Sequence, residues 1–550
     1  MSKFIWKAQF NKPNNIKDIM KDVLQQKKID LHTIKEYINF DVPIHSGFLL
    51  NNMREGIIEL LKHKRLAIIG DKDGDGITAS AIMYLGLKSL TDRFDWDIMC
   101  SIPERKDGYG LSKKFVDQAI AFNADCLITV DNGITALEAV DYANENNITV
   151  IVTDHHMPKD KLPQCIIIDP QCDDYPFKYI CGALVAFKFI ESLYQYLAID
   201  IDSDLYDELL SFATIGTVAD VMKLNDENRY YVGKGLQVLN NTKNIGLKAL
   251  FNEAGLTNIM AETIAFQIGP MINAAGRLST AKLAYDLLLS EDIIEAQKIA
   301  HQLVSLNQER RKLQKEATQN IPVEILKDNF IILHKPDISN GICGSIASSI
   351  TDKYKKPCFV FSGHNRLVGS GRSAKGYSIL KFIQSIPDIA QGGGHEAAAG
   401  ISILEDNLEL LRKLANEDFT KWLNDNEKDV KDYLYILCEL DFKLINMRLV
   451  NNLEALAPFG NGNPRPVFMT QNVHILNREI LGSEQNVLKL ELVKDNQKFT
   501  AISFADTMNL FNDKMNEIDI CYNLVLNEWN NNSNIQLQLV DLQQSIGDDF

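Results

Sequence analysis

The chain has 550 residues, and its 57 basic and 73 acidic residues give a formal net charge of −16 at pH 7. This length predicts several domains, and a composition of 45% hydrophobic and 24% charged residues excludes a mostly disordered or fibrous chain. The acidic balance argues against a surface that binds nucleic acid everywhere, because phosphate binding needs clustered Lys and Arg, but it leaves a local basic groove open.

No segment reaches the roughly 18 uninterrupted apolar residues that a membrane helix needs, and the N-terminus lacks the apolar core of a signal peptide. Nine cysteines, an odd number without a C-x-x-C pair, are typical of reduced thiols rather than of a disulfide framework or a zinc site. We therefore expect a cytoplasmic protein with no membrane partner.

Residues 14–62 are expected to form helices without a functional signal of their own. From residue 65, short apolar runs such as RLAIIG, DCLITV and ITVIVT alternate with amphipathic segments of helical length. Apolar runs of about four to eight residues between helices of about ten to fifteen are typical of βαβ units. This part of the chain is therefore predicted to be an α/β domain built on a parallel sheet.

Residues 226–322 continue as helices and end in a long charged segment, for which a solvated face is favoured over a binding site. The basic residues of that segment are Arg310, Arg311, Lys312 and Lys315. A second, smaller βα region follows over residues 328–415. The remaining C-terminal part ends in five short alternating segments without intervening helices, which predict a small closed β-barrel of the kind that often binds oligonucleotides.

The segment GDKDGDG places Asp71, Asp73 and Asp75 between a predicted strand and a predicted helix. Three carboxylates at every second position of a glycine-containing loop can converge on a hard cation. An EF-hand begins in the same way, but its twelfth position requires a Glu, and here that position is Ile82. A metal site is the favoured interpretation, and a solvated acidic turn is the alternative.

Two further motifs follow predicted strands, VDNG with Asp131 and TDHHMP with Asp154, His155 and His156. Because ligands of open parallel sheets bind outside the carboxyl ends of the strands, these motifs should meet at one rim. Mixed carboxylate and imidazole ligands suit manganese, with magnesium possible and zinc less suited. Asp220 follows an apolar helical run and is either a helix cap or a further ligand; as a ligand, it would supply enough donors for two metals that share one carboxylate.

Several cationic side chains lie in glycine-rich segments, where backbone amides can approach an anion. They are Arg105 in IPERKDGYG, Arg277 in GPMINAAGR, Arg372 in GSGRS and His395 in QGGGHEAAAG. For each of them the alternative is a capping residue or a tight turn. The last segment is the most specific, because three glycines before a small-residue helix would form an anion site at a helix N-terminus.

The combination of GDKDGDG, VDNG, TDHHMP and GTVADV resembles the motifs of the DHH phosphoesterases. The segments GSGRS and GGGHEAAAG are similar to the second domain of that family, and GPMINAAGRLSTA and PFGNGNPRPVF resemble its single-strand-specific exonuclease branch. The resemblance extends from about residue 60 to the C-terminus and implies a multidomain α/β fold. Its parts would be an N-terminal helical segment (1–60), a parallel-sheet DHH catalytic domain (61–225), a long helical connector (226–325), a smaller α/β DHHA1 substrate domain (326–415) and an OB-like nucleic-acid-binding barrel (416–550).

Carried over to this sequence, the resemblance implies a two-metal centre. The implied catalytic residues are Asp73, Asp75, Asp131, His155, His156 and Asp220. The implied metal ligands form two sets that share Asp131: Asp73 and Asp131, aided by Asp71, for the first ion, and Asp75, Asp131, His155 and Asp220 for the second. His156 would face the scissile phosphate, while Asp154 would orient the histidines.

The resemblance also implies that one group of residues holds the phosphates near the 5′ end of a strand. These residues are Arg105, Arg277, Ser370, Arg372, Gly393, Gly394 and His395. One departure from the family pattern concerns the first metal. Some members have a His four positions before the residue that matches Asp73, where this chain has Ile69, which makes Asp71 more important.

The family implies a single-strand-specific DNA exonuclease of DNA repair and recombination that degrades 5′ to 3′ into mononucleotides with two Mn²⁺ or Mg²⁺ ions. Single-stranded DNA is the expected partner, a single-strand-binding protein or a helicase is a further candidate, and a monomer is the expected state. The alternatives are a short-oligonucleotide or nucleotide phosphoesterase of the same group and an inactive replication scaffold. The extra helical region and the barrel favour a polymer substrate, and the complete set of motif side chains argues against inactivity.

Overall fold

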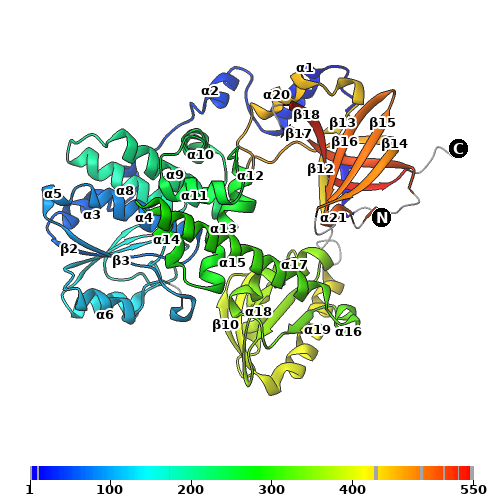
Figure 1. The fold of residues 1–550 in the computed structure, drawn as a ribbon. Helices are drawn as coiled ribbons and strands as arrows, with labels where there is room; N and C mark the ends of the chain where they lie inside the picture. Colours follow the sequence, from blue (N-terminus) through cyan, green and yellow to red (C-terminus); the bar gives the residue numbers. More distant parts are fainter. Residues whose placement is uncertain are drawn as a thin grey trace.

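The computed structural model describes residues 3–8, 11–108, 110–172, 174–426, 432–482, 487–508, 510–511, 515–529 and 532–545. Within these ranges, the chain forms two α/β units, a helical connector and a β-barrel (Figure 1). No helix among them is long and apolar enough to cross a bilayer. No disulfide joins the nine cysteines, which all lie among the described residues, and six of them are buried, in agreement with the prediction of reduced thiols.

The first α/β unit is a five-stranded sheet in which all neighbouring strands are parallel. In order across the sheet, its strands are β3 (Asp97–Ser101), β2 (Arg65–Ile69), β4 (Cys126–Val130), β5 (Thr149–Thr153) and β6 (Ile166–Ile168). The helices of this unit are α3 (Met53–Leu60), α4 (Gly74–Lys88), α5 (Thr91–Phe94), α6 (Lys113–Ala121), α7 (Leu137–Glu145), α8 (Gly182–Tyr196) and α9 (Ser203–Ala219). The predicted α/β domain with a parallel sheet is confirmed.

Helices cover both faces of this sheet because successive strand residues point to opposite sides. Leu66 and Ile68 pack into the larger core, which contains side chains of α3, α4, α8 and α9. Ala67 and Ile69 pack into a separate core with side chains of α6 and α7. Strands that are apolar on both faces are typical of a doubly covered parallel sheet.

The strand order creates a switch point between β2 and β4. After β2 the chain forms β3 on one side of β2 and then returns to form β4 on the other side. The connections that follow β2 and β4 therefore run in opposite directions across the sheet. Crevices for ligands in open α/β sheets form outside the carboxyl ends of strands at such a point. The acidic segments that follow β2 and β4 therefore begin at the edge of this crevice.

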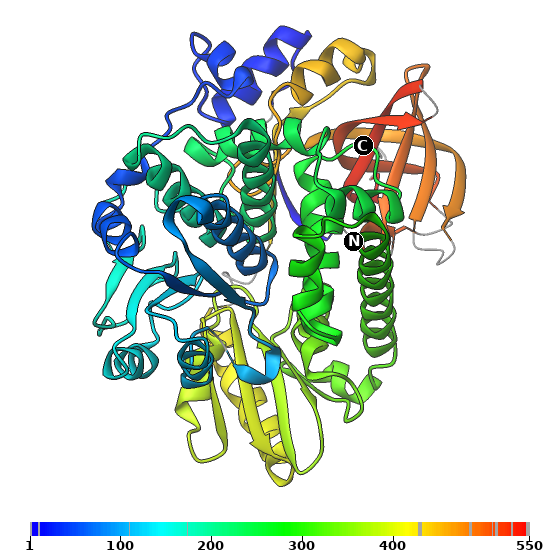
Figure 2. The same cartoon turned by 60° about the vertical axis from the view of Figure 1, so that its left-hand side comes forward.

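The connector consists of helices that pack on α4 and α9 and lead to the second α/β unit. They are α10 (Asp226–Leu239), α11 (Ile245–Glu253), α12 (Ala261–Thr263), a π-helical turn (Ile264–Ile268), α13 (Gly269–Leu278), α14 (Lys282–Leu288) and α15 (Ile293–Gln319). The 27 residues of α15 span about 40 Å at about 1.5 Å per residue. Figure 2 shows this long helix running beside α13 toward the second unit.

The second α/β unit has a mixed five-stranded sheet. In order across the sheet, its strands are β10 (Ala390–Gly394), β11 (Ala398–Leu404), β9 (Arg366–Arg372), β8 (Cys358–Ser362) and β7 (Ile331–His334). Only β7 and β8 are parallel neighbours. Its helices are α16 (Val323–Lys327), α17 (Asn340–Tyr354), α18 (Ile379–Ser385) and α19 (Leu408–Asp425).

The C-terminal barrel closes on itself, as predicted. Its five long strands are β14 (Phe468–Leu481), β15 (Val487–Lys494), β16 (Gln497–Phe504), β17 (Glu517–Trp529) and β18 (Asn532–Gln544). They follow one another around the barrel as β14-β15-β16-β18-β17, and β17 pairs with β14 again. This is the closed five-stranded arrangement of an OB fold. The short strand β13 (Cys438–Glu439) pairs with β14, α20 (Met447–Glu454) packs in the barrel core, and α21 (Ala505–Met508) follows β16.

The N-terminal segment is divided between the two ends of the molecule. A strand that the sequence did not indicate, β1 (Ile5–Ala8), pairs with β12 (Tyr433–Ile436) beside the barrel. Helix α1 (Ile16–Gln26) packs its buried side chains into the barrel core, and α2 (Ile34–Asn39) follows it. Helix α3, in contrast, packs on the parallel sheet.

Candidate metal centre

The turn after β2 is built to present carboxylates. Asp73 is the N-cap of α4, and one of its carboxylate oxygens accepts hydrogen bonds from the backbone N–H groups of Asp75 and Gly76, both at 3.1 Å. A Cβ atom at Gly76 would come within 2.6 Å of Asp71, so only glycine fits there. The turn therefore brings Asp71, Asp73 and Asp75 together at the start of the helix.

Asp75 and Asp131 are fixed by the neighbouring elements. The carboxylate of Asp75 accepts hydrogen bonds from the N–H groups of Gly182 at 2.7 Å and Ala183 at 2.8 Å, at the N-terminus of α8. Asp131 directly follows β4 in the left-handed region with φ of 62°. A Cβ atom at Gly182 would lie 2.6 Å from Asp131 Oδ1, so the close approach of α8 to this carboxylate requires glycine.

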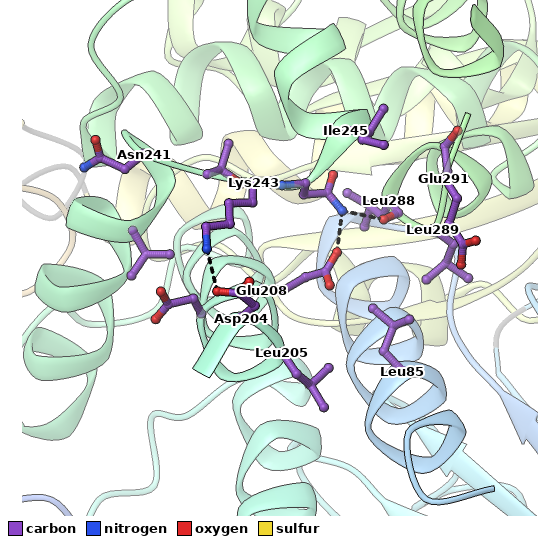
Figure 3. Close-up of a pocket in the computed structure, with 15 residues that line it drawn as sticks. Leu85, Asp204, Leu205, Glu208, Asn241, Lys243, Ile245, Leu288, Leu289 and Glu291 are labelled. Carbon is purple, nitrogen blue, oxygen red and sulfur yellow. Dashed lines mark hydrogen bonds and ion pairs between the residues drawn. The ribbon is translucent and has the colours of Figure 1, made fainter. Parts of the chain in front are cut away.

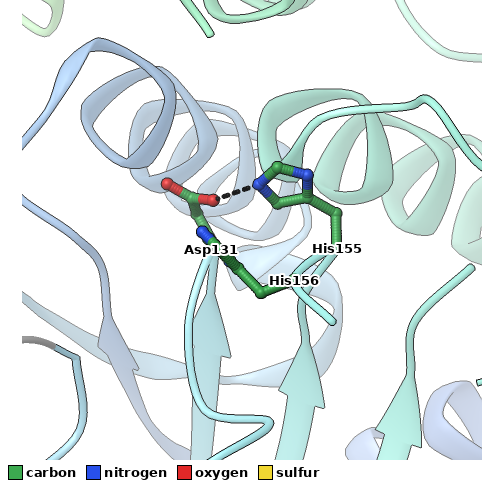
Figure 4. A group of neighbouring side chains, drawn as sticks. All are labelled: Asp131, His155 and His156. Carbon is green, nitrogen blue, oxygen red and sulfur yellow. Dashed lines mark ion pairs between the residues drawn. The ribbon is translucent and has the colours of Figure 1, made fainter. Parts of the chain in front are cut away.

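His155 lies beside Asp131 (Figure 4) and also approaches two acidic residues from other elements. Its Nε2 atom lies 3.1 Å from Asp131 Oδ1, 3.6 Å from Asp75 Oδ2 and 3.8 Å from Asp220 Oδ2. Asp220 is the C-cap of α9, so it is a cap and also a member of the group. The side chains of His155, Asp75 and Asp131 are buried, which leaves Asp220 as the more accessible member.

Asp154 holds the adjacent histidine. One of its carboxylate oxygens lies 2.8 Å from His156 Nδ1 and accepts the N–H group of His155 at 2.7 Å, while the other oxygen accepts the N–H group of Ile134 at 3.0 Å. Burial lowers the pKa of His156, but its hydrogen bond to Asp154 and the surrounding carboxylates outweigh this effect and raise the pKa to about 9. His156 is therefore an imidazolium at neutral pH, held at the rim of the site.

The side chains form two groups that could each hold a cation. Three carboxylates make up the first group, which we call the Asp73 cluster: Asp71, Asp73 and Asp131. Two carboxylates and one imidazole make up the second, which we call the His155 cluster: Asp75, His155 and Asp220. Within each cluster, the ligand atoms lie within 4.8 Å of one another. Asp131 also lies beside His155, so it can serve both clusters.

The donors fit divalent ions. Asp220 Oδ2 is buried and has no hydrogen-bond donor among the described residues, so it offers a lone pair at the centre of the His155 cluster. Oxygen ligands with one imidazole suit manganese, and carboxylates alone also suit magnesium. Asp131, His155 and His156 form a third group within the same distance, but a protonated His156 has no lone pair to offer a cation.

The raised pKa values of three carboxyl groups indicate that the site favours a positive charge. Burial and the charges of Asp75 and Asp73 raise the pKa of Asp131 well above its usual value, and burial with the same neighbours raises the pKa of Asp220 to about 8. The pKa of Asp73 is raised to about 6 by desolvation of its carboxyl group and by the charges of Asp71 and Asp75. The residue as a whole is nevertheless exposed at the rim. The part of each shift that comes from neighbouring carboxylates reflects charges that a bound cation would neutralise.

These shifts predict pH-dependent metal binding. Carboxyl groups with a raised pKa hold protons near neutral pH, and a cation binds the carboxylate, so Mn²⁺ binding should release protons. With Asp73 at about 6 and Asp220 at about 8, we expect the apparent affinity for Mn²⁺ to rise between pH 6 and pH 8. Calorimetric titrations in buffers of different ionisation enthalpy measure the released protons. Equal affinities at pH 6 and pH 8 would contradict this assignment.

Arg105 and Arg277 lie near Asp71 and Asp73, and the charges of Arg310 and Arg372 also act on Arg277; we call these four residues the arginine cluster. Burial lowers the pKa of Arg277 to about 10, and the positive charges of the other three contribute to this shift, while Asp73 opposes it. Arg277 Nη1 donates to Gly341 O at 3.2 Å, and Arg372 Nε donates to Ser348 Oγ at 3.1 Å. A group of partly buried positive charges next to a metal centre can form a site for phosphate.

Arg310 is a candidate that the sequence interpretation missed. The charged segment was expected to be a solvated face, but Arg310 on α15 lies half-buried, bonded to Asn307 and Gln314, and its charge acts on Arg277. Lys312 on the same helix is exposed. The prediction is therefore wrong for Arg310, because one side of the helix packs on α13 and α17.

The predicted anion site at a helix N-terminus in GGGHEAAAG is also wrong. These residues form the antiparallel pair β10 and β11, in which Gly393 lies opposite Gly400, and Gly400 opposite Ser370 of β9. Gly393, Gly394 and His395 are exposed, and a Cβ atom at Gly393 would meet nothing within 4 Å. The three glycines thus provide a bare strip of sheet instead of a helix N-terminus.

Ser370 and Arg372 lie on β9, which β11 separates from these glycines, and both approach α17. A Cβ atom at Gly344 of α17 would lie 3.3 Å from Arg372 Nη2 and 3.5 Å from Ser370 Oγ. The first turn of the same helix packs on Arg277, because a Cβ atom at Gly341 would lie 2.1 Å from Arg277 O. Helix α17 therefore links Ser370 and Arg372 of β9 to Arg277.

Two asparagines support the site and were not singled out from the sequence. Asn132 donates to the backbone carbonyl groups of Ile69, Gly70 and Val130, and it accepts the N–H group of Leu111 at 3.0 Å. Asn273 Oδ1 accepts the N–H group of Gly74 at 2.8 Å, which fixes α13 to the start of α4. Asn132 lies within the motif VDNG and Asn273 within GPMINAAGR. Their positions inside these motifs are the one feature of the sequence that could have identified them.

We expect Asn132→Ala to lower the free energy of unfolding by about 2–4 kcal/mol, because buried carbonyl groups of β2 and β4 lose their donor. The matched control is Asn144→Ala, since Asn144 makes its hydrogen bond to Gln164 O at an exposed position. Urea unfolding of both variants measures the difference. Equal losses in the two variants would show that Asn132 has no special role in joining the strands.

A separate cavity of about 380 Å³ lies away from the metal centre, between the start of α9, the α10–α11 turn and the end of α14 (Figure 3). Its walls include Leu85, Leu205 and Leu288. Lys243 binds Asp204 across its rim, and Asn244 is hydrogen-bonded to Glu208. No residue of the two metal clusters or of the arginine cluster lines this cavity.

The fold and the site together define the class of protein, a metal-dependent phosphoesterase of the DHH type. Residues 65–217 match the model of the DHH family N-terminal domain, residues 327–421 match the DHHA1 domain, and residues 436–541 match the RecJ OB domain. The chain belongs to the RecJ family.

Relatives with this name align along most of the chain. The single-stranded-DNA-specific exonuclease RecJ of Escherichia coli is 32% identical over 530 residues, which cover 89% of this chain and 88% of that protein. The protein of the same name from Bacillus subtilis is 29% identical over 94% of this chain, and the alignment spans 66% of its length. The crystal structure of RecJ from Thermus thermophilus with Mn²⁺ has a TM-score of 0.82 and 26% identity, covering 98% of this chain and 80% of that one.

Proposed function

We propose that this protein is a single-stranded-DNA-specific exonuclease that degrades its substrate from 5′ to 3′ into mononucleotides with two Mn²⁺ or Mg²⁺ ions. The observation that carries the proposal is the pair of metal clusters around Asp131, placed beside the arginine cluster. Family membership supports the substrate, because the relatives are named for single-stranded DNA.

The metal ligands and His156 have different roles in the proposed reaction. Two bound cations would supply the charge that stabilises the attacking and leaving oxygens of phosphodiester hydrolysis. Asp131 would set the spacing of the two clusters, because it reaches both. His156, whose protonated form the hydrogen bond to Asp154 favours, is placed to donate a hydrogen bond to a phosphate oxygen at the rim.

The strand would be held by groups from three parts of the chain. We assign the terminal phosphates to Arg105, Arg277, Ser370 and Arg372, and the sugar-phosphate backbone to the bare strip with Gly393, Gly394 and His395, where glycines allow close approach. The barrel contributes a groove of about 1010 Å³ lined by Lys489, Lys498 and Phe499 among others. Basic and aromatic side chains in such a groove suit a single strand, which offers phosphates and unstacked bases.

Both alternatives from the sequence lose support. A phosphoesterase for short oligonucleotides needs neither the connector nor the barrel groove. An inactive scaffold has no need for buried carboxylates whose mutual repulsion costs stability. We further propose that the protein acts as a monomer in the cytoplasm, in DNA repair and recombination, with a single-strand-binding protein or a helicase as partner.

Digestion of end-labelled single-stranded DNA tests the proposal. The expected result is immediate release of labelled mononucleotide from a 5′-labelled strand in the presence of Mn²⁺, with late release from a 3′-labelled strand and no release in EDTA. Early release from the 3′-labelled strand would reverse the assigned direction. Hydrolysis of dinucleotides alone, with no attack on longer strands, would favour the short-oligonucleotide phosphoesterase.

A further inference from the structure

The metal ligand Asp220 lies at a helix end with an unusual backbone. Helix α9 closes with the N–H group of Val221 donating to Val218 O and that of Met222 donating to Thr217 O, both at 3.1 Å, which is a Schellman motif. The position after the C-cap in this motif is normally glycine, because its φ is positive. Here it is Val221, with φ of 56° and a residue exposure of 65%. A β-branched residue in this conformation is strained, so other contacts must hold the turn.

Those contacts come from the barrel end of the molecule, from a segment that we call the Asn461 loop (residues 458–466). Asn461 Nδ2 donates to Val221 O at 2.8 Å, and Asn461 O accepts the N–H group of Leu224 at 2.7 Å. The two hydrogen bonds bracket the residues directly after Asp220. The loop therefore fixes the strained turn from outside the catalytic unit.

Two glycines let the loop approach this closely. A Cβ atom at Gly460 would lie 2.8 Å from Leu224 Cδ1. Gly462 has a φ of 77°, and a Cβ atom there would lie 3.1 Å from Lys223 Cβ. The run GNG thus matches the surface of residues 221–224.

The loop is itself anchored to the connector. Arg229 of α10 is buried and donates to Leu456 O at 3.2 Å and Ala457 O at 2.8 Å. Arg465 binds Glu262 of the connector at 2.7 Å and Glu454 of α20 at 2.6 Å. These contacts keep the Asn461 loop in place against the end of α9.

We propose that Asn461 is a positioning residue for the metal ligand Asp220, so that attachment of the barrel controls loading of the His155 cluster. The hydrogen bond to Val221 O holds the strained turn, the turn sets the direction of Asp220, and Asp220 completes the cluster with Asp75 and His155. The consequence for the reaction rests on the proposed function, whereas the consequence for metal binding does not.

Titration of the full-length protein with Mn²⁺, followed by electron paramagnetic resonance of the free ion, tests this proposal without DNA. Asp220→Asn first identifies which of the two dissociation constants belongs to the His155 cluster. We expect Asn461→Ala to raise that constant about fivefold, the factor expected for one lost hydrogen bond, and to leave the other constant within about twofold. The matched control is Asn451→Ala, because Asn451 is exposed on α20 of the same unit.

A double substitution separates positioning from general damage. Val221→Gly removes the strain of the turn, so Asn461→Ala combined with Val221→Gly should bind Mn²⁺ within about twofold of the parent. In nuclease assays, Asn461→Ala should need more Mn²⁺ for half-maximal kcat at unchanged KM for DNA. Parent-like Mn²⁺ constants in Asn461→Ala, or equal weakening in Asn451→Ala, would overturn the proposal. A parent that binds two Mn²⁺ ions without degrading DNA would instead refute the proposed function.

Discussion

Asp131→Asn should abolish metal-dependent DNA degradation while the protein stays folded. Asp131 is the carboxylate that both metal clusters can use, so its loss removes a ligand from each of them. Metal ions supply several kcal/mol of charge stabilisation in such reactions, and we therefore expect kcat to fall by about 10³–10⁴-fold. Asparagine is the suitable replacement because it tolerates the left-handed conformation of this position, with φ of 62°.

The control for this variant is Asp141→Asn, the same chemical change at an exposed position of α7. We expect Asp141→Asn to retain the parent activity. Thermal melting of the metal-free proteins adds a second readout, because Asp131→Asn relieves repulsion among buried carboxyl groups and should not lower the melting temperature. Residual activity within tenfold of the parent would show that Asp131 does not bridge the two clusters.

Arg277→Gln should have the second-largest effect, on use of the DNA substrate. Arg277 lies at the centre of the arginine cluster, close enough to Asp73 for the two charges to interact. Hydrogen bonds to charged groups contribute about 1.5–3 kcal/mol, so we expect kcat/KM for single-stranded DNA to fall by about 10–100-fold. The dependence of binding on salt should also weaken, by about 0.7 in the logarithmic slope for one lost phosphate contact.

Lys312→Gln is the matched control for the arginine cluster, since Lys312 is an exposed cation on α15. It should change neither kcat/KM nor the salt slope measurably. Arg277→Lys should fall between the parent and Arg277→Gln, because lysine keeps the charge but not the forked donor. Equal effects of Arg277→Gln and Lys312→Gln would indicate that general surface charge, and not the cluster, attracts the strand.

The parts of the fold that follow from local pattern could be predicted from the sequence. The strands around Ile68, Ile128 and Ile151 are apolar runs between amphipathic helices, and this alternation indicates a parallel sheet. Once the sheet is parallel, Asp75 and Asp131 must meet at its carboxyl edge, whatever the details of packing. The five barrel strands were likewise visible as alternating segments without helices between them.

The parts that depend on distant partners could not be predicted in this way. Three alanines after His395 favour a helix locally, but Ala399 and Gly400 pair with β9 and β10, and the tertiary sheet overrides the local preference. Arg310 belongs to a charged helix, and only the packing of α13 and α17 on that helix buries it. The contact of Asn461 with Val221 joins residues 240 positions apart, so no local pattern indicates it.

Anomalous diffraction from crystals soaked in Mn²⁺ tests the central claim most directly, because it locates the ions without any assumption about activity. The account predicts two peaks roughly 4 Å apart, both next to Asp131, with one beside Asp73 and the other beside His155. A single peak, or two peaks of which only one adjoins Asp131, would contradict a centre built on a shared carboxylate.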